Sequence, residues 1–153
     1  MIRDEQIAMS VGAGALALIL GALGFQYLAH LPPCEMCHWQ RWPHIAAAII
    51  GLAIVPFQRK KARSLAWAVV MLVALSGLIG AYQTGMQLGI LPGPDNCTVA
   101  HPYVMGSGAP PPEISCNAVT WSLFGLSLAG YNAIFSLLLA ATGAFLLRCK
   151  HAA

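Results

Sequence analysis

Charged side chains are scarce in this sequence. Asp, Glu, Lys and Arg make up 8% of its 153 residues, whereas hydrophobic residues make up 58%. Ordinary soluble domains contain about 25% charged and about 45–50% apolar residues. So few charges cannot cover the surface of a soluble domain, and so many apolar residues exclude intrinsic disorder. The composition therefore predicts a protein whose main solvent is a membrane.

Long apolar runs occupy most of the chain. A helix rises about 1.5 Å per residue, so about 20 residues cross a hydrocarbon core of about 30 Å. Four stretches meet or approach this length, and we expect each to span the membrane. They cover approximately residues 7–29, 36–57, 64–85 and 119–147. The predicted fold is all-α, a four-helix transmembrane bundle formed by a single integral membrane domain over residues 1–153, with two extracytoplasmic loops at approximately 30–38 and 87–118.

The first apolar run is expected to stay in the protein as a membrane helix. It is longer than the apolar core of a secretory signal, which has about 7–15 residues. Asp4 and Glu5 also differ from the basic start that such signals favour. A cleaved signal peptide is the alternative.

The basic residues indicate how the helices are oriented, because cytoplasmic flanks of membrane helices retain Lys and Arg. Seven of the eight basic residues lie beside the spans so that an even number of crossings places them on one side: Arg3, Arg59, Lys60, Lys61, Arg63, Arg148 and Lys150. We expect both termini to be cytoplasmic and the two loops to lie outside, in a bacterial periplasm or its equivalent. The basic cluster is then a topology signal, and neither a nucleic-acid partner nor an oligomer is expected.

The predicted topology separates the five cysteines. Cys34, Cys37, Cys97 and Cys116 fall in the outer loops, whereas Cys149 follows the last span on the cytoplasmic side. An oxidising compartment favours disulfides over free thiols. Four cysteines permit three pairings. Pairing within each loop joins Cys34 to Cys37 and Cys97 to Cys116, and the pairing at rest stays open.

The Cys34-x-x-Cys37 pair stands where a helix is expected to begin. It closes too small a ring to be an effective staple, but a helix N-terminus stabilises a thiolate and suits redox chemistry. Offsets of three, four and seven residues place Cys34, Cys37 and Arg41 on one face. An arginine near hydrocarbon needs a compensating group, and a polar electron acceptor with a lipid tail would provide one. The alternative for Arg41 is an interfacial residue beside Trp39 and Trp42.

The outer segment after the third span is rich in proline. Six of the ten prolines lie between residues 92 and 112, so this segment cannot be one helix. Loops of such length are usually functional or disordered. If its cysteine pair exchanges with the Cys34–Cys37 pair through a mixed disulfide, the loop is the moving arm of a relay. A structural staple is the alternative. The apolar residues between Val99 and Met105 predict that part of the loop rests on the membrane.

Together these features resemble the DsbB family of bacterial disulfide bond formation proteins. The resemblance rests on the four spans, the run Pro33–Arg41 (PCEMCHWQR), the second cysteine pair after the third span, and Trp121–Ser127 (WSLFGLS), which opens the fourth span. It implies a protein-dithiol:quinone oxidoreductase that reoxidises a periplasmic DsbA-like thioredoxin-fold protein. The electrons would pass through two disulfide pairs to a membrane quinone, either ubiquinone or menaquinone.

The resemblance also implies a role for individual residues. Cys97 would be attacked by the reduced partner, Cys116 would then attack at Cys34, and Cys37 would become the thiolate that faces the quinone. Arg41 would bind the quinone and stabilise the negative charge that develops on it. Relatives often have His where Gln83 stands. Gln83 is therefore a candidate quinone contact that could donate a hydrogen bond but could not carry a proton.

Two other functions fit parts of the sequence. Cys34–His38 (CEMCH) matches the attachment signature of c-type haem, which would make the protein a membrane electron carrier. That function leaves Cys97, Cys116 and Arg41 without a role. The other alternative is a non-enzymatic membrane protein whose outer loops are stapled by disulfides and serve as an interaction surface. No resident metal is expected, because an oxidising compartment works against thiolate ligands for zinc.

Overall fold

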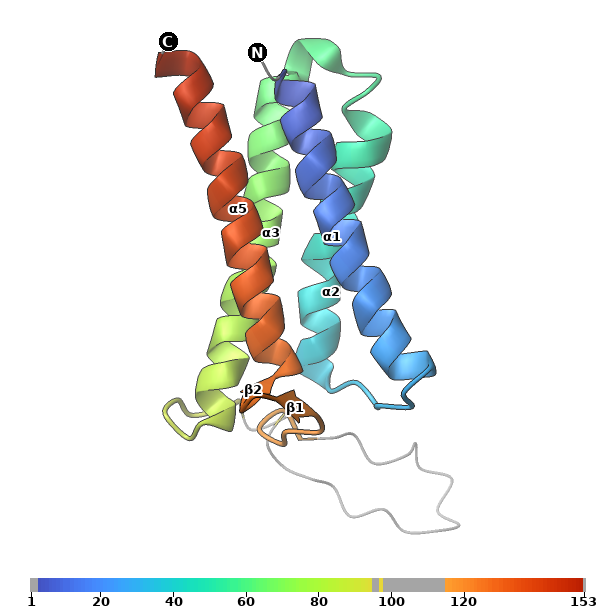
Figure 1. Ribbon diagram of the computed structural model, residues 1–153, viewed down its shortest axis with the longest axis vertical. Coiled ribbons are helices and arrows are strands. Elements are labelled where there is room, and N and C mark those ends of the chain that lie inside the picture. The colour runs from blue at the N-terminus through green and yellow to red at the C-terminus, as the bar shows by residue number, and fades with distance from the viewer. Residues whose placement is uncertain (1–2, 95–96, 98–114, 153) are drawn as a thin grey trace.

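The computed structural model describes residues 3–94, 97 and 115–152, and these are mostly helical (Figure 1). The elements are α1 (Asp4–Tyr27), α2 (Glu35–Ala48), the π-helical segment η1 (Ile49–Ile54), the short 3-10 helix η2 (Arg59–Lys61), α3 (Ala62–Gln87), β1 (Ser122–Leu123), β2 (Leu126–Ser127) and α5 (Leu128–Ala152). The long helices lie side by side, which is compatible with the predicted four-helix bundle. The apolar residues between Val99 and Met105, predicted to rest on the membrane, lie outside the described residues.

Three of the described helices are long and apolar enough to cross a membrane. They cover Asp4–Tyr27, Arg59–Gln87 and Leu128–Cys149. The remaining predicted span corresponds to α2 and η1, which follow each other with helical backbone at the junction. This segment carries Gln40, Arg41 and His44 among its apolar residues, and these polar side chains distinguish it from the other three.

The predicted fourth helix, 119–147, was wrong at its start, because α5 begins at Leu128. The residues before it form an antiparallel hairpin in which Ser122 pairs with Ser127 and Leu123 pairs with Leu126. Phe124 and Gly125 form its two-residue turn with φ angles of 50° and 78°. Positive φ at two successive residues is typical of a tight hairpin turn and is incompatible with a right-handed helix. The all-α prediction therefore missed one small two-stranded sheet.

The bundle core joins α1, α2, α3 and α5, with Ile50 of η1 packed against it. Its buried side chains are mostly small or β-branched, and they include Val11, Ala15, Ala66, Val69, Val73, Ala140 and Leu147. The helix α1 and the segment η1 approach each other closely at Gly51. A Cβ atom on Gly51 would lie 2.6 Å from the carbonyl oxygen of Ala8 and 3.0 Å from the Cα of Gly12. Only glycine at position 51 permits this backbone contact.

The two ends of the bundle differ in chemistry. α1 begins, and α5 ends, at the same end as the connection between α2 and α3 (Figure 1). At this end Glu5 is buried and pairs with Arg3 and with Arg59, whose Nε lies 3.3 Å from Glu5 Oε2. Glu5 thus links the start of α1 to the α2–α3 connection. The hairpin and the Cys34–Cys37 pair lie at the opposite end.

Candidate active site

The Cys34–Cys37 pair lies at the start of α2, as its spacing predicts. Cys34 is the N-cap residue, and its Sγ accepts a hydrogen bond from the backbone N–H of Cys37 at 3.2 Å. The sulfur therefore occupies the position that a serine or aspartate oxygen often takes at a helix start. Both residues are thiols in this structure. The structure therefore lacks the Cys34–Cys37 disulfide that pairing within each loop would form.

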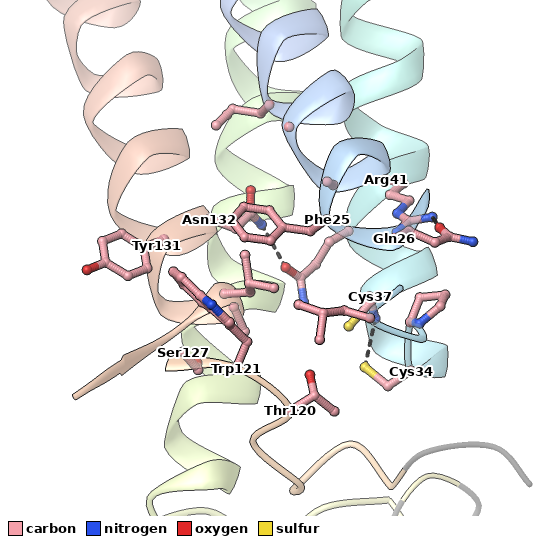
Figure 2. Close-up of a pocket in the computed structure, with 18 of the residues that line it drawn as sticks. Phe25, Gln26, Cys34, Cys37, Arg41, Thr120, Trp121, Ser127, Tyr131 and Asn132 are labelled. Atoms are coloured by element: carbon pink, nitrogen blue, oxygen red, sulfur yellow. Dashed lines mark hydrogen bonds between the residues drawn. The ribbon is translucent and has the colours of Figure 1, made fainter. Parts of the chain in front are cut away.

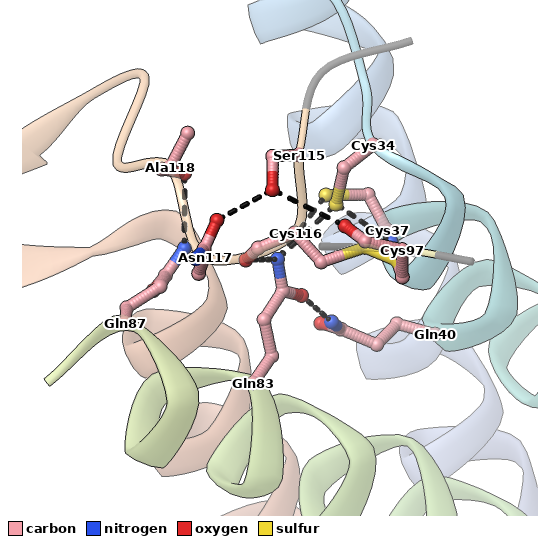
Figure 3. Close-up of a disulfide and its surroundings, with 10 residues drawn as sticks. All are labelled: Cys34, Cys37, Gln40, Gln83, Gln87, Cys97, Ser115, Cys116, Asn117 and Ala118. Atoms are coloured by element: carbon pink, nitrogen blue, oxygen red, sulfur yellow. Dashed lines mark hydrogen bonds between the residues drawn. A yellow bond between two sulfur atoms is a disulfide. The ribbon is translucent and has the colours of Figure 1, made fainter. Parts of the chain in front are cut away.

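Cys97 and Cys116 form the second pair and are joined by a disulfide (Figure 3). Their Cα atoms are 5.4 Å apart, and the N–H of Cys116 donates to the carbonyl oxygen of Cys97 at 2.7 Å. Both residues are buried. For the second outer loop, the structure therefore has the within-loop pairing.

The two cysteine pairs lie in one buried cluster. Cys34, Cys97 and Cys116 pack together with two methionines, Met36 and Met86, and Cys37 packs against them. Figure 3 shows Cys34 and Cys37 beside the disulfide, close to the end of α3. Thiol–disulfide exchange requires one sulfur to reach another. The cluster therefore has a geometry that suits exchange between the pairs.

Gln83 on α3 lies between the two pairs and is 2% exposed. Its Nε2 donates to Cys34 Sγ at 3.1 Å and to the carbonyl oxygen of Cys116 at 3.3 Å, and it lies 3.9 Å from Cys37 Sγ. The sequence identified Gln83 as a candidate quinone contact. The structure adds a direct contact with the cysteines, which one polar residue late in an apolar helix could not reveal.

A cavity of about 410 Å³ lies beside the Cys34–Cys37 pair (Figure 2). Residues from α1, α2, α3 and α5 line it. Apolar side chains form much of its wall, among them Leu18, Ala22, Phe25, Leu128 and Phe135. Its polar residues include Cys37, Arg41, Gln83 and Gln87. Small-molecule sites typically measure about 300–1,000 Å³ and combine apolar walls with a few polar groups, so this cavity has the character of a ligand site.

Arg41 lies in the wall of this cavity together with Cys34 and Cys37, as the helical spacing predicts. Its Nη1 donates to Gln26 Oε1 on α1 at 2.6 Å. Trp39 and Trp42 are exposed and do not line the cavity. This geometry favours a residue that faces the cavity over an interfacial arginine beside the two tryptophans.

The two thiols of the Cys34–Cys37 pair differ in how readily they lose a proton. The pKa of the Cys34 thiol is raised well above its usual range, mainly because its side chain shares a hydrogen bond with Cys37 and also because it is buried. When the pair loses its first proton, the negative charge therefore lies on Cys37. Arg41 lies one helical turn further along α2 and provides a positive charge on the same cavity wall.

Gln87 provides an observation that tests whether the cavity fits a polar ligand. Its Oε1 is buried and has no hydrogen-bond partner among the described residues, whereas its Nε2 donates to the carbonyl oxygen of Ala118 at 3.4 Å. A buried acceptor without a partner costs about 1–3 kcal/mol. A ligand with a hydrogen-bond donor would satisfy it, so the residues present fit an oxygen-bearing ring such as a quinone in its reduced form. The sequence alone indicated no role for Gln87 or Gln26.

Of the three residues of the haem signature, Cys34 and Cys37 line the cavity but His38 does not. Cys34 is buried against the second cysteine pair, whereas His38 is exposed and does not line the cavity. This arrangement does not support haem attachment through Cys34–His38. Over residues 3–94, 97 and 115–152, no group of three or more His, Cys, Asp or Glu side chains is placed to hold a metal ion.

Comparison with known proteins gives one consistent result. The family model described as Disulfide bond formation protein DsbB matches residues 4–146. The chain is 30% identical over 141 residues to Disulfide bond formation protein B of Dechloromonas aromatica, which covers 82% of this chain and 81% of the relative. It is 30% identical over 149 residues to the protein of the same name from Alkalilimnicola ehrlichii, covering 90% of this chain and 89% of the relative. No solved structure matches the chain.

Proposed function

The chain belongs to the DsbB family of disulfide bond formation proteins, and we propose that it is a membrane protein-dithiol:quinone oxidoreductase that reoxidises a periplasmic DsbA-like protein. One observation carries this proposal. The two cysteine pairs share a buried cluster, and one pair also lines a cavity with Arg41 in its wall.

The first half of the reaction begins at Cys97. A thiolate of the reduced partner attacks Cys97 Sγ, and the Cys97–Cys116 bond breaks with its electron pair on Cys116. Cys116 then attacks Cys34 of an oxidised Cys34–Cys37 pair, and Cys37 leaves as a thiolate. The burial of Cys34 in one cluster with the second pair supports this order, as does Gln83, which donates both to Cys34 Sγ and to the carbonyl oxygen of Cys116.

The second half of the exchange releases the product. The other thiol of the partner attacks the mixed disulfide at the partner's own sulfur, so the oxidised partner departs and Cys97 becomes a thiolate. Cys97 then attacks Cys116, which reforms Cys97–Cys116 and leaves the electron pair on Cys34. Two electrons and two protons have moved from the partner to the Cys34–Cys37 pair. The structure has this arrangement, with Cys97–Cys116 joined and both other cysteines as thiols.

A bound quinone, ubiquinone or menaquinone, supplies the two-electron acceptor that returns Cys34 and Cys37 to a disulfide. The protein's own side chains position the reacting groups and stabilise the negative charge that develops. Cys37 bears the thiolate, and the Arg41 guanidinium provides positive charge where negative charge develops. Gln87 Oε1 would accept a hydrogen bond from a hydroxyl of the reduced quinone, and the apolar walls would exclude water. Gln26 keeps Arg41 in place through their hydrogen bond.

We also propose that α2 with η1 is the fourth crossing and that the protein is a monomeric single domain of the bacterial inner membrane. The segment packs against α1 and α3, the neighbouring membrane helices. Arg59 and Arg148 lie at the end of the bundle where α1 begins, and the cysteine cluster lies at the other. Because Lys and Arg favour the cytoplasmic side, both termini face the cytoplasm and the cysteines face the periplasm.

The test is a coupled assay on the purified full chain in detergent. Reduced DsbA and a short-chain ubiquinone analogue are mixed with the protein, and thiol loss and quinol formation are followed together. We expect one quinol for each two thiols lost, and no quinol with Cys34→Ser. Thiols that persist in the presence of both the protein and the quinone analogue would contradict the proposal and favour disulfides of purely structural function. A covalent haem absorbance in the same preparation would favour the electron carrier.

A further inference from the structure

Gln83 is the end of a chain of side-chain amides that crosses the bundle. Its Oε1 accepts a hydrogen bond from Gln40 Nε2 on α2 at 2.5 Å (Figure 3). Gln40 Oε1 in turn accepts from Asn132 Nδ2 on α5 at 2.8 Å. Asn132 Oδ1 accepts from the Ser136 hydroxyl at 2.9 Å. Each amide therefore uses its oxygen toward the bundle interior and its NH2 group toward the cysteines.

The inner end of the chain is anchored by further buried groups. His44 Nε2 lies 3.1 Å from the Ser136 hydroxyl, and the Ser76 hydroxyl donates to the carbonyl oxygen of Gln40 at 2.7 Å. Ser76 and Ser136 are fully buried, and Gln40 is 6% exposed. Water cannot readily replace a partner that is lost from such a network. Each amide therefore keeps its oxygen toward the bundle interior and its NH2 group toward the cysteines.

The direction of these hydrogen bonds decides whether Gln83 turns its amide oxygen or its NH2 group toward the cysteine sulfurs. An amide can turn over and exchange its oxygen and nitrogen, and only its partners favour one orientation. A turned Gln83 would place its NH2 group against the NH2 group of Gln40 and its oxygen against the carbonyl oxygen of Cys116. Both contacts would leave buried groups unpaired, which is costly. Gln40 and Asn132 therefore fix Gln83 as a donor toward Cys34.

We propose that Gln83 is a catalytic hydrogen-bond donor to Cys34 in the exchange between the two cysteine pairs, and that Gln40 and Asn132 are positioning residues that act through it. This inference rests on the function proposed above. It assigns Gln83 to the sulfur chemistry, whereas the sequence offered it as a quinone contact.

The step that uses the donor is the reformation of the second disulfide. Cys97 attacks Cys116, the Cys97–Cys116 bond forms, and the Cys34–Cys116 bond breaks with its electron pair on Cys34. Gln83 Nε2 lies 3.1 Å from the sulfur that receives this charge, and a hydrogen bond to a charged acceptor is stronger than one to a neutral acceptor. The same NH2 group donates to the backbone carbonyl oxygen of Cys116 at 3.3 Å. Gln83 therefore holds Cys34 and Cys116 close together while the bond between their sulfurs breaks.

The first experiment measures the donor directly, without partner or quinone. In a Cys37→Ala background with the Cys97–Cys116 disulfide intact, the rate of Cys34 alkylation is followed against pH by peptide mass spectrometry. Gln83→Met removes the donor at similar volume and should move the midpoint of the profile up by about one pH unit. Gln40→Met should move it in the same direction. Gln83→His, whose ring N–H can donate, should restore it. The matched control is Gln58→Met, an exposed glutamine at the other end of the bundle.

The second experiment measures the exchange. Oxidised full-length protein is mixed with reduced DsbA, quenched with acid, and analysed for the species in which Cys34 is linked to Cys116. This species should persist about tenfold longer in Gln83→Met than in the unchanged protein or in Gln58→Met. If folded Gln83→Met and Gln40→Met have the same midpoint and the same lifetime as the unchanged protein, the inference is wrong. A midpoint that Gln83→His fails to restore would also overturn it.

The two proposals fail in different ways. If the unchanged protein never links Cys34 to Cys116 and leaves the DsbA dithiol reduced, the proposed function is wrong. If the unchanged protein oxidises DsbA but the Gln83 variants match it in both experiments, only the role of Gln83 is wrong.

Discussion

The Arg41 guanidinium on α2 and the Gln26 amide on α1 are joined by a 2.6 Å hydrogen bond in the wall of the cavity beside Cys37. The contact ties two helices together and sets the position of the positive charge. Within the described part of the chain, the salt bridges involve Glu5 rather than Arg41. The Arg41 charge is therefore available to an electron-rich ligand in the cavity.

Replacing Arg41 with alanine should weaken the use of quinone and leave the thiol exchange intact. The positive charge is lost next to the site where negative charge develops, so kcat/KM for a short-chain ubiquinone analogue should fall by at least about tenfold. Gln26→Leu, which frees the guanidinium, should have a smaller effect in the same direction. The measurement is steady-state quinone reduction with a small dithiol as the electron source. Arg63→Ala, an exposed position near the start of α3, is the control, and unchanged kinetics in Arg41→Ala would make Arg41 an interfacial residue.

Replacing Cys97 with serine should separate the two half-reactions. Without Cys97 the partner has no sulfur to attack, so oxidation of reduced DsbA should fall to background. The Cys34–Cys37 pair keeps its own contact with the cavity, and a small dithiol should still drive quinone reduction. Both rates can be measured on one preparation. Continued turnover of DsbA would show that the partner enters at another cysteine.

The sequence predicted the long helices because apolar length is a local signal. The expected run 64–85 and the helix Ala62–Gln87 differ by only two residues at each end. The start of the last helix could not be found in this way, because Leu123 and Leu126 are as apolar in a hairpin as in a helix. Phe124 has a positive φ, which a phenylalanine rarely adopts. The residue type therefore gives no sign of the turn.

The site was predictable only where residues are close in the chain. Helical spacing alone brings Cys34, Cys37 and Arg41 to one cavity wall. By contrast, the contact between Gln83 and Cys34 joins residues 49 positions apart, and that between Gln40 and Asn132 joins residues 92 apart. Such pairs depend on how the helices pack, so a single sequence cannot predict them.

The number of free thiols should report the redox state of the relay. With excess quinone, alkylation without reductant should label one cysteine, Cys149, because the other four are paired. After quinone is removed and a small dithiol is applied briefly, the structure's arrangement predicts three labelled cysteines, Cys34, Cys37 and Cys149. Intact mass after alkylation in denaturant, which exposes the buried thiols, gives both counts. Four labelled outer cysteines in the oxidised sample would contradict the relay.

The Cys34 thiol should react with an alkylating agent only at alkaline pH in the reduced pair. Its pKa is raised, first by the hydrogen bond with Cys37 and then by burial, so at neutral pH it holds its proton and little thiolate is available. Cys37→Ala removes the largest cause of this rise, and the midpoint of the pH profile should therefore move to lower pH. The midpoint, rather than the absolute rate, is the measurement, because burial slows the reagent in both proteins. A profile that does not move would assign the raised pKa to burial alone.

Replacing Gly51 with alanine should destabilise the bundle without touching the cysteines. The added Cβ would meet the carbonyl oxygen of Ala8 at 2.6 Å and the Cα of Gly12 at 3.0 Å, both backbone atoms that can move only if α1 shifts. Overpacking of this kind costs about 1–3 kcal/mol, and unfolding in detergent should show a loss of that size. Gly24→Ala is the matched control in α1, since a Cβ there meets nothing within 4 Å and alanine favours helix. Equal stability of the two variants would mean that α1 and η1 separate readily, and the close contact at Gly51 would then not hold the bundle together.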